Sequence, residues 1–591
     1  RIPDTEAEMA TTTGGRIIAE MLKEEGVEKI FGIVDGTYLQ LLKGARDLGM
    51  ELITPRHETI AAHMAGAYAR LTGKLGVCIA SNGPGVANML SGVAVENAEG
   101  NRVLLITSSR RSAITYPDRG GAYQCFDQVA VIRPMSKWSV CAPTSDRIPE
   151  LLRKAFRKCY EGRPGVVHLD VPENLVNGER KPVPILKPFQ YRRVDPIPPT
   201  SAQVEKAAEM LVSARLPLIH VGSGVIHAQA FDELEELATL LHSPVTTSWS
   251  ARGALRETSE LAWPMIHVKA VNQVRNRADV VLCLGADVGE TDWWGKAPYW
   301  ALPADQKWIQ VDLDEDIIGR NRPVDLGIMA DVKVFMQQLI EKLRVAADRI
   351  RMRERQAATA ELRKEIEKDR AKLNEKLSDL SSPMMTAHVG SICRQVLDDD
   401  AVLIFDGGNT AVWGHFFCEM RKPNTQLATH HFGHLGAGVG QALGAAAAFP
   451  DRQICCIAGD GAMGFNVQEI ETAVRNNLKV IYIVCCDKQW GMVKMSMSFA
   501  LKPLKTLIMK SLSPEETINT ELREIQFDKV AQAMGAHGER VANPADLKPA
   551  LERCLAAGKC SVIHVDVDPT KHMWAPGLMH FKAMHQEPKG K

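Results

Sequence analysis

Two aspartates in the last third of the sequence are placed where a metal ion and a phosphate group could bind together. Asp460 lies in a Gly-Asp-Gly turn after the apolar run 453–458, and Asp487 follows the apolar run 480–486. Apolar runs of this length are typical of buried strands. Carboxylate oxygens suit a hard divalent cation, and the amides of a glycine-rich turn can face phosphate oxygens.

The residues between the two runs predict how the aspartates meet. Apolar residues recur at helical spacing from Phe465 to Leu478, and the side chain of Asn466 is expected to cap this helix. A strand–helix–strand unit crosses over right-handed and makes its strands parallel, so Asp460 and Asp487 should reach the same edge of the sheet. On the Gly-Asp-Gly turn alone, a solvated turn with two strand-end aspartates is an equally good interpretation.

The turn, the helix, the second apolar strand and Asp487 together resemble the signature of the thiamine diphosphate-dependent enzymes, many of which carry Asn at the position of Asp487. The resemblance implies that Asp460, Asp487 and the backbone carbonyl of Gln489 hold Mg²⁺, which in turn holds the diphosphate of the cofactor. An aspartate still offers oxygen to the metal, but it adds negative charge beside a diphosphate.

Glu58 is the second position at which the residues and the resemblance can be compared. It follows Arg-His after the expected strand 50–54 and precedes the Ala-rich helix 59–71. By itself it reads as a helix N-terminal carboxylate stabilised by the helix dipole. The order of Arg-His-Glu, the helix with segment 66–70, and Gly-Pro-Gly at 83–85 resembles the pyrimidine-binding domain of the family. The resemblance implies that Glu58 binds the aminopyrimidine nitrogen of the cofactor and relays a proton there.

Two further stretches of the first third are candidates. The glycine-rich loop 120–127 resembles a loop that carries an active-site Gln in the acetohydroxyacid synthase-like branch, so Gln124 is a catalytic and substrate-binding candidate, with a surface loop as the alternative. Arg110 and Arg111 follow an expected strand. They read more readily as a solvated pair than as an anion clamp for a phosphate-bearing substrate.

In the last third the resemblance assigns the remaining candidates. The turn 406–410 is expected at the diphosphate, and Leu435 is expected to bend the cofactor. His434 is a weaker catalytic candidate, because it could be an ordinary loop histidine. Gln489, Trp490 and Val493 would line the substrate pocket together with Gln124. The full set of expected cofactor-binding residues is Glu58, Gly408, Asn409, Thr410, His434, Leu435, Gly459, Asp460, Gly461, Ala462, Asp487, Gln489, Trp490, Gly491 and Met492.

Composition limits the class of protein. The chain has 591 residues, which is too many for one core and predicts two to four domains. Its formal net charge is zero, and neither a basic patch nor an apolar run of about 18 residues occurs, so nucleic acid and membrane partners are not expected. Residues 1–15 read as a disordered leader. The thirteen cysteines lack zinc-type spacing, which favours free thiols and a cytoplasmic protein.

Strand and helix patterns alternate through most of the chain, which predicts an α/β protein with three doubly wound parallel-sheet domains. The expected domains are a pyrimidine-binding domain at 10–182, a central Rossmann-like domain at 203–345, a diphosphate- and magnesium-binding domain at 384–570, and a tail at 571–591 that could be an active-site lid. A proline-rich linker covers 181–202, and the charged stretch 346–380 reads as an exposed helical connector.

In the central domain the resemblance allows ADP or the ADP part of coenzyme A. Gly222-Ser223-Gly224 is only a fragment of a dinucleotide fingerprint. Residues 285–288 read Gly-Ala-Asp-Val, where flavin-binding synthases tend to have a Gly-Ala-Arg-Phe-like sequence, and this departure disfavours FAD.

The resemblance implies an enzyme that breaks or forms a carbon–carbon bond in a small-molecule substrate, working as a homodimer or homotetramer. Met495-Ser496 stands where the synthases typically have Gln-Trp, which favours a 2-hydroxyacyl-CoA lyase that yields formyl-CoA and an aldehyde or ketone. The first alternative is condensation of 2-keto acids like that of acetolactate synthase. The second is a non-catalytic paralogue that binds thiamine diphosphate, which the presence of Glu58, Asp460 and Asp487 disfavours.

Overall fold

The structure, a computed structural model, describes residues 11–578 and 580, with the exception of residues 116 and 118. Most of the expected leader and the end of the tail therefore lie outside the described residues. The chain divides into two compact units, Arg1–Asp195 with Leu443–Ala448, and Pro196–Ala442 with Phe449–Lys591. Each unit is described by itself.

The first unit is built on a six-stranded parallel sheet in the order β3-β2-β4-β5-β7-β6. Its inner strands are apolar runs buried on both faces, as parallel strands covered by helices require. The strands are β2 (Lys29–Gly32), β3 (Glu51–Ile53), β4 (Gly76–Ala80), β5 (Val103–Ser109), β6 (Trp138–Cys141) and β7 (Val166–Pro172), and a separate pair joins β1 (Thr12–Thr13) to β8 (Glu179–Arg180).

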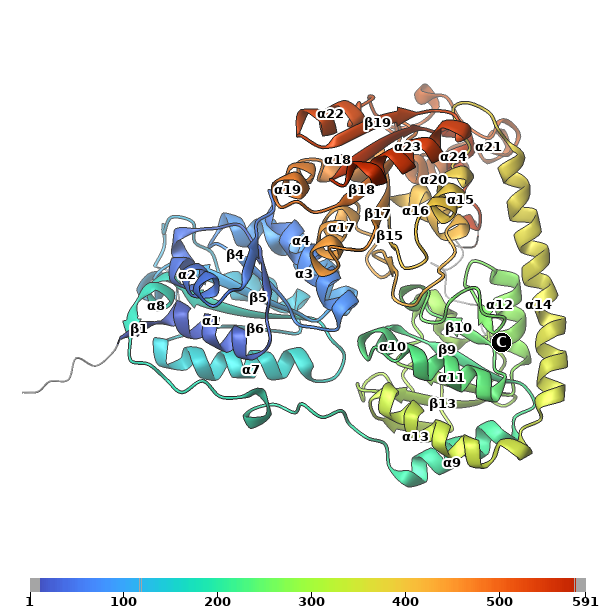
Figure 1. Cartoon of the computed structure of the whole chain (residues 1–591), viewed down its shortest axis with the longest axis horizontal. Helices are drawn as coiled ribbons and strands as arrows, with labels where there is room; N and C mark the ends of the chain where they lie inside the picture. The colour runs from blue at the N-terminus through green and yellow to red at the C-terminus, as the bar shows by residue number, and fades with distance from the viewer. Residues whose placement is uncertain (1–10, 116, 118, 579, 581–591) are drawn as a thin grey trace, which may run out of the picture. The chain divides into compact units, whose positions relative to one another are not determined.

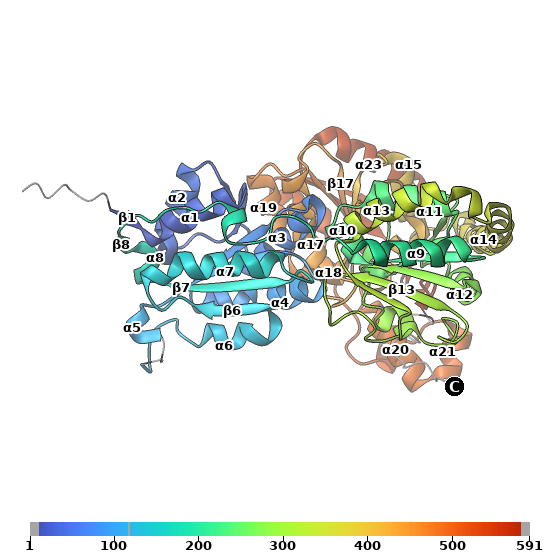
Figure 2. The same cartoon turned by 90° about the horizontal axis from the view of Figure 1, so that it is seen from below.

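Helices cover both faces of this sheet (Figures 1 and 2). One layer contains α1 (Gly14–Glu24), α2 (Leu39–Asp47), α7 (Ile148–Tyr160) and α8 (Glu173–Asn177), and the other contains α3 (Glu58–Thr72), α4 (Pro84–Ala98) and α6 (Gln128–Ile132). A short helix, α5 (Ser112–Thr115), follows β5. Because the strands are parallel, their carboxyl ends share one edge of the sheet. The loops that follow β3, β4 and β5 begin at this edge.

The second unit contains two more six-stranded parallel sheets. The sheet of the central region has the order β11-β10-β9-β12-β13-β14, with β9 (Pro217–Val221), β10 (Val245–Thr247), β11 (Ala262–Trp263), β12 (Val280–Leu284), β13 (Lys307–Asp312) and β14 (Leu326–Met329). Its helices are α9 (Ser201–Ser213), α10 (Ser223–His227), α11 (Phe231–Leu241), α12 (Val268–Arg277) and α13 (Val332–Val345).

The sheet of the C-terminal region has the order β16-β15-β17-β18-β20-β19. Its strands are β15 (Val402–Asp406), β16 (Gln426–Leu427), β17 (Ile454–Gly459), β18 (Val480–Cys486), β19 (His537–Val541) and β20 (Ser561–Asp566). The helices are α15 (Ala387–Val396), α16 (Gly408–Phe417), α17 (Ala437–Ala448), α18 (Asp460–Phe465), α19 (Glu469–Arg475), α20 (Gly491–Leu501), α21 (Pro503–Met509), α22 (Phe527–Ala533), α23 (Pro544–Ala557) and α24 (Pro569–Met573).

The three sheets confirm the predicted fold class of three α/β domains with parallel sheets. The domain boundaries stay a prediction. All thirteen cysteines are free thiols, and eleven of them are buried. No helix within the described residues is long and apolar enough to cross a membrane.

Two local predictions are wrong. Asn466 does not cap the helix that follows it, because α19 begins only at Glu469 with Gln468 at the N-cap position. The side-chain amide of Asn466 instead donates to the carbonyl of Gly436 at 2.9 Å. The charged stretch after residue 346 does form the long helix α14 (Met352–Asn374), but part of it is buried. Arg355 is fully buried because its guanidinium donates to the carbonyls of Leu211, Ala214 and Leu241.

Candidate functional site

The carboxyl ends of β17 and β18 bring the two aspartates together, as the sequence predicts. The strands are parallel neighbours, with Gly459 opposite Cys485, so Asp460 and Asp487 follow directly from the same sheet edge. Asp460 accepts hydrogen bonds from the amide of Gly461 and from the amide of Lys488, each at 2.8 Å. These bonds fix the carboxylate at the N-terminus of α18, where the helix dipole favours negative charge.

The environment of this pair suits a cation. Burial raises the pKa of Asp460 to about 7, and the charge of Asp487 adds to the effect. Burial also raises the pKa of Asp487 to about 6. Asp487 is only 8% exposed, and its Oδ2 has no hydrogen-bond partner among the described residues. A buried carboxylate with an unpaired oxygen next to a half-buried one is stabilised by a divalent ion, for which oxygen ligands are the natural donors.

A cavity of about 470 Å³ adjoins the aspartates. This volume lies in the range typical of cofactor sites. The cavity wall includes every candidate that the sequence placed in the last third of the chain: Gly408, Asn409, Thr410, His434, Leu435, Gly459, Asp460, Gly461, Ala462, Asp487, Gln489, Trp490, Gly491, Met492 and Val493. The structure thus gathers these residues at one place, while their individual roles stay predictions.

The cavity wall also fits the diphosphate of thiamine diphosphate. Asn409 is 4% exposed, and neither its amide nitrogen nor its oxygen has a partner among the described residues. Gly407 adopts a positive φ of 88°, which favours glycine, and leads into the N-terminus of α16, a typical anion-binding position. A Cβ on Gly461 would lie 2.7 Å from the Trp490 ring, so only glycine leaves the present space open.

Several wall residues were missed by the sequence analysis. Trp249 and Thr291 come from the central region, from the 3₁₀ turns Trp249–Ala251 and Glu290–Gly295. His415, His430 and His572 also line the cavity. No spacing or motif marks these positions, because tertiary packing alone brings them to the cavity, whether they lie on turns, as Trp249 does, or in helices, as His415 and His572 do.

His572 shows how the tail is attached to the site. Its Nδ1 lies 2.7 Å from the hydroxyl of Thr386, its Nε2 lies 3.2 Å from that of Thr410, and its carbonyl accepts from Nε1 of Trp413. Burial lowers the pKa of His572 to about 4, so the imidazole is neutral at pH 7. The tail therefore contributes His572 to the wall. The expected lid role concerns residues that lie partly outside the described ones.

Glu58 and Gln124 belong to the first unit. Glu58 lies in the first turn of α3 and is buried, and its Oε2 accepts from the side-chain amide of Asn88 at 3.0 Å. Gln124 is exposed and has a positive φ of 53°. Its backbone carbonyl accepts from the side chain of Asn82 at 3.1 Å. The strained backbone and the anchoring bond fix this loop at the edge where β4 ends, consistent with a functional loop.

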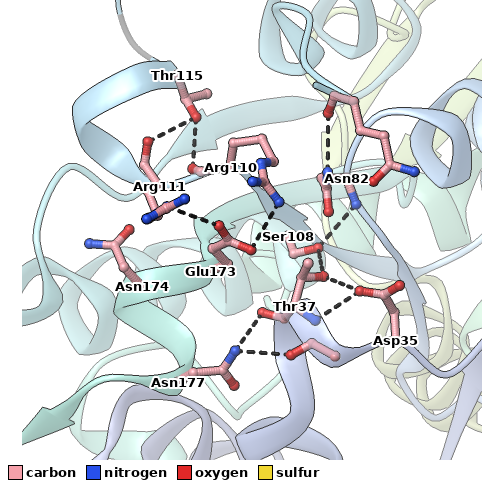
Figure 3. A network of polar contacts seen from close by, with 12 residues as sticks. Asp35, Thr37, Asn82, Ser108, Arg110, Arg111, Thr115, Glu173, Asn174 and Asn177 are labelled. Atoms are coloured by element: carbon pink, nitrogen blue, oxygen red, sulfur yellow. Dashed lines mark hydrogen bonds and ion pairs between the residues drawn. The ribbon is translucent and has the colours of Figure 1, made fainter. Parts of the chain in front are cut away.

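The same edge carries a polar network (Figure 3). Thr37 links the carboxylate of Asp35 to the hydroxyl of Ser108, which also accepts from the backbone amide of Asn82. Beside it, Arg110 and Arg111 approach the two carboxylate oxygens of Glu173 at 3.4 and 3.5 Å.

Arg111 is 64% exposed, as the interpretation of a solvated pair expects, whereas Arg110 is only 21% exposed. Both arginines face Glu173, so as an anion clamp they would have to share their charge with this carboxylate.

The glycine turn of the central region does not present a free cradle for a nucleotide. The amides of Gly222 and Gly224 donate to the carbonyls of Leu284 and Gly285 at 2.9 and 3.0 Å. These two donors are therefore used within the protein. The turn therefore gives no support to the binding of ADP, coenzyme A or FAD in this region.

Comparisons with known proteins agree with this site. Residues 12–131, 204–339 and 406–565 match the N-terminal TPP binding, central and C-terminal TPP binding domains of the thiamine pyrophosphate enzymes, respectively. The chain belongs to the thiamine diphosphate-dependent enzymes. TPP, thiamine pyrophosphate, is the same cofactor as thiamine diphosphate.

Its relatives in this family are named as acetolactate synthases. The chain is 30% identical over 565 residues to "Acetolactate synthase" of Mycobacterium bovis, with 93% of this chain and 87% of the relative covered. It is 28% identical over 585 residues to "Probable acetolactate synthase large subunit" of Methanocaldococcus jannaschii, with 94% and 92% covered. It is 26% identical over 581 residues to "Acetolactate synthase isozyme 3 large subunit" of Escherichia coli, with 96% of each covered. The chain is therefore an enzyme of carbon–carbon bond chemistry, in the branch that contains the acetolactate synthases.

Proposed function

We propose that the chain is a thiamine diphosphate- and Mg²⁺-dependent enzyme that condenses 2-keto acids in the manner of an acetolactate synthase. The observation that carries the proposal is the cavity in which Asp487 and Asn409 present buried, unpartnered polar atoms beside Asp460. The names of the relatives support condensation over the cleavage of a 2-hydroxyacyl-CoA, which the sequence favours.

In this proposal the C-terminal region binds the polar end of the cofactor. Asp460, Asp487 and the backbone carbonyl of Gln489 hold Mg²⁺, and the N-terminus of α16 with Asn409 binds the diphosphate. When bound, thiamine diphosphate would supply a nucleophilic carbon for the substrate carbonyl and a thiazolium ring able to take up the electrons of the adjacent carbon–carbon bond. Leu435 and Met492 supply apolar surface in the same cavity, which excludes water and fixes how the cofactor bends.

Glu58 has the role of proton relay. A carboxyl group at the aminopyrimidine nitrogen holds a proton there and lowers the barrier to proton removal at the reacting carbon. In the family the pyrimidine-binding region of one subunit meets the diphosphate-binding region of another, so the chain works as a homodimer or homotetramer. Two of the relatives are named as large subunits, which makes a smaller partner subunit a further candidate.

The 2-hydroxyacyl-CoA lyase is the second candidate, and the start of α20 favours it. Met495 is buried, and Ser496 is exposed and small where the synthases typically carry an aromatic residue. Neither residue lines the cavity, so the resemblance alone places this position on the acceptor side of the synthase site. The lyase and the synthase differ in product, which makes them simple to separate.

The test is a product assay with cofactor binding measured in parallel. The protein with thiamine diphosphate and Mg²⁺ is incubated with pyruvate, with pyruvate plus 2-ketobutyrate, and with a 2-hydroxyacyl-CoA, and products are identified by mass spectrometry. Acetolactate or acetohydroxybutyrate is expected, whereas formyl-CoA would establish the lyase. Cofactor binding that EDTA abolishes, with no product from any substrate, would indicate the non-catalytic paralogue.

A further inference from the structure

Part of the cavity wall is made of aromatic rings instead of carboxylates. Trp249, Phe405, His415 and His430 all line it. The ring of His415 lies 5.5 Å from Trp249 and 4.8 Å from Phe405, centroid to centroid, with interplanar angles of 68° and 69°. Its centroid lies 5.1 Å from that of His430. Edge-to-face packing on two sides fixes the plane of the His415 imidazole.

The tautomer of His415 is fixed by a neighbouring arginine. Nη1 of Arg252 donates to Nδ1 of His415 at 3.1 Å. Arg252 itself is held by Glu257, at 2.7 Å from Nε and 2.9 Å from Nη2, and by the carbonyl of Cys418 at 2.9 Å. A guanidinium has only donors, so Nδ1 of His415 must be the acceptor, and the ring proton of the neutral imidazole must be on Nε2.

The charge state of His415 is fixed as well. The residue is 6% exposed, and burial together with the positive fields of His430 and Arg252 lowers its pKa well below the usual value of 6.5. The charged or titratable groups around it are Arg252, Glu257 and His430, whereas Trp249 and Phe405 carry no charge. The imidazole is therefore neutral throughout the physiological range.

Nε2 of His415, the remaining nitrogen, has no hydrogen-bond acceptor among the described residues. The imidazole is nevertheless held in place by the Arg252 bond and by its contacts with the rings of Trp249 and Phe405. A fixed donor without an acceptor in the wall of a cavity costs free energy until a ligand or a water molecule accepts the bond. Such a donor is suited to recognise an oxygen atom of a bound molecule.

We propose that His415 is a substrate-binding residue whose Nε2–H donates a hydrogen bond to a carbonyl or carboxylate oxygen of the substrate. The inference rests on the proposed function, since it takes the cavity to hold a 2-keto acid beside the cofactor. Because the imidazolium form is not populated near neutral pH, His415 recognises the oxygen without transferring a proton to it. The site thus selects a substrate with an oxygen acceptor next to the reacting carbon, and disfavours one with an apolar group there.

Two substitutions separate the donor from the arginine contact. His415→Asn places an amide oxygen near the position of Nδ1, so it can still accept from Arg252 but has no donor at the Nε2 position. His415→Gln reaches the Nε2 position with an amide donor and loses the Arg252 contact. The proposal expects kcat/KM for the 2-keto acid to fall about 10- to 100-fold in His415→Asn and to be largely retained in His415→Gln.

Thiamine diphosphate affinity, measured by calorimetry with Mg²⁺, is expected to stay within about threefold of the wild type in both variants, and the pH profile of kcat/KM is expected to keep its shape. In ¹⁵N-histidine NMR spectra, the signal lost on His415→Asn is expected to be that of a neutral Nε2–H imidazole that does not titrate between pH 6 and 8.

Three results would overturn the proposal: unchanged kcat/KM in His415→Asn, a loss confined to cofactor affinity, or a His415 signal that titrates near neutrality. A wild-type protein without activity on 2-keto acids would instead refute the proposed function. The NMR arm does not depend on turnover, so it would still decide the tautomer and charge of His415.

Discussion

Asp487→Asn tests whether the two strand-end carboxylates repel each other before a metal binds. The substitution keeps an oxygen at the position and the size of the side chain, and it removes the buried one of two neighbouring negative charges. Burial raises the pKa of Asp460 to about 7, with the charge of Asp487 as the next cause, and raises the pKa of Asp487 to about 6. The metal-free protein should therefore become more stable when Asp487 is neutral.

The magnitude follows from the shift at Asp487. A rise from 3.8 to about 6 corresponds to roughly 3 kcal/mol at about 1.4 kcal/mol per pKa unit, as an upper bound on the cost of keeping this group charged. Because the folded-state pKa is raised, the cost is absent below about pH 4, grows as the pH rises from about 4 to about 6, and is fully present above that. Asp487→Asn is therefore expected to stabilise the metal-free protein at pH 7.5 by about three times as much as at pH 4.5.

Scanning calorimetry in EDTA is the assay. For a unit of roughly 390 residues, 3 kcal/mol corresponds to about 3–4 °C in the unfolding temperature at pH 7.5. At pH 4.5 only about a third of this cost is present, so the expected change is about 1 °C. Asp331→Asn is the matched control, because Asp331 caps α13 away from the cavity and asparagine caps helices about as well. It should change the unfolding temperature little at either pH.

The reasoning is refuted if Asp487→Asn lowers the unfolding temperature at pH 7.5, or raises it equally at both pH values. Either result would mean that the carboxylate is compensated within the protein and does not depend on a cation. Saturating Mg²⁺ should reverse the order of stability at pH 7.5, since the wild type then gains more from the ion than the variant does.

Three further predictions concern the same machinery. Glu58→Gln should leave thiamine diphosphate affinity within about threefold of the wild type but lower kcat at least about 100-fold, because the proton relay is lost. Calorimetry measures the affinity and product formation measures kcat. Retained turnover would contradict the role of Glu58 as proton relay. Asn409→Ala should weaken thiamine diphosphate binding about 10-fold or more in calorimetry. Thermal stability should stay equal or rise, because the substitution removes a buried amide that has no hydrogen-bond partner among the described residues. A less stable protein that binds the cofactor normally would contradict this prediction. Mg²⁺ affinity should fall about 30- to 100-fold from pH 7.5 to pH 5.5, because protons compete with the ion for Asp460 and Asp487, whose pKa values are about 7 and about 6. A titration that gives equal Mg²⁺ affinity at both pH values would exclude these carboxylates as ligands.

The C-terminal part of the site was predictable because its geometry is local. Asp460 and Asp487 are separated by a crossover that contains only the short helices α18 and α19, and the right-handed crossover of parallel strands leaves a single arrangement for them. The turn at 406–410 ends the neighbouring strand β15 and therefore reaches the same edge. All the candidates from this part of the chain line one cavity.

The central region's contribution could not be predicted. Trp249 and Thr291 lie more than a hundred residues before the C-terminal sheet, and which loop reaches the cavity depends on how two sheets pack within the unit. The position of Arg355 is a similar case. The many charged residues of α14 predict that the helix is exposed. The guanidinium of Arg355 can nevertheless be buried, because three carbonyls at the ends of α9 and α11 accept its hydrogen bonds. The direction of those carbonyls cannot be read from a sequence.

The charges of the cavity explain why metal and cofactor should bind together. Its wall contains Asp406, Asp460 and Asp487, but no lysine or arginine among the described lining residues. Two of its histidines cannot replace them, since burial lowers the pKa of His572 to about 4 and holds that of His415 well below its usual value. A diphosphate alone would therefore meet carboxylates without a counter-charge. A divalent ion between the aspartates and the diphosphate supplies that charge, so the affinity for each should rise steeply when the other is present.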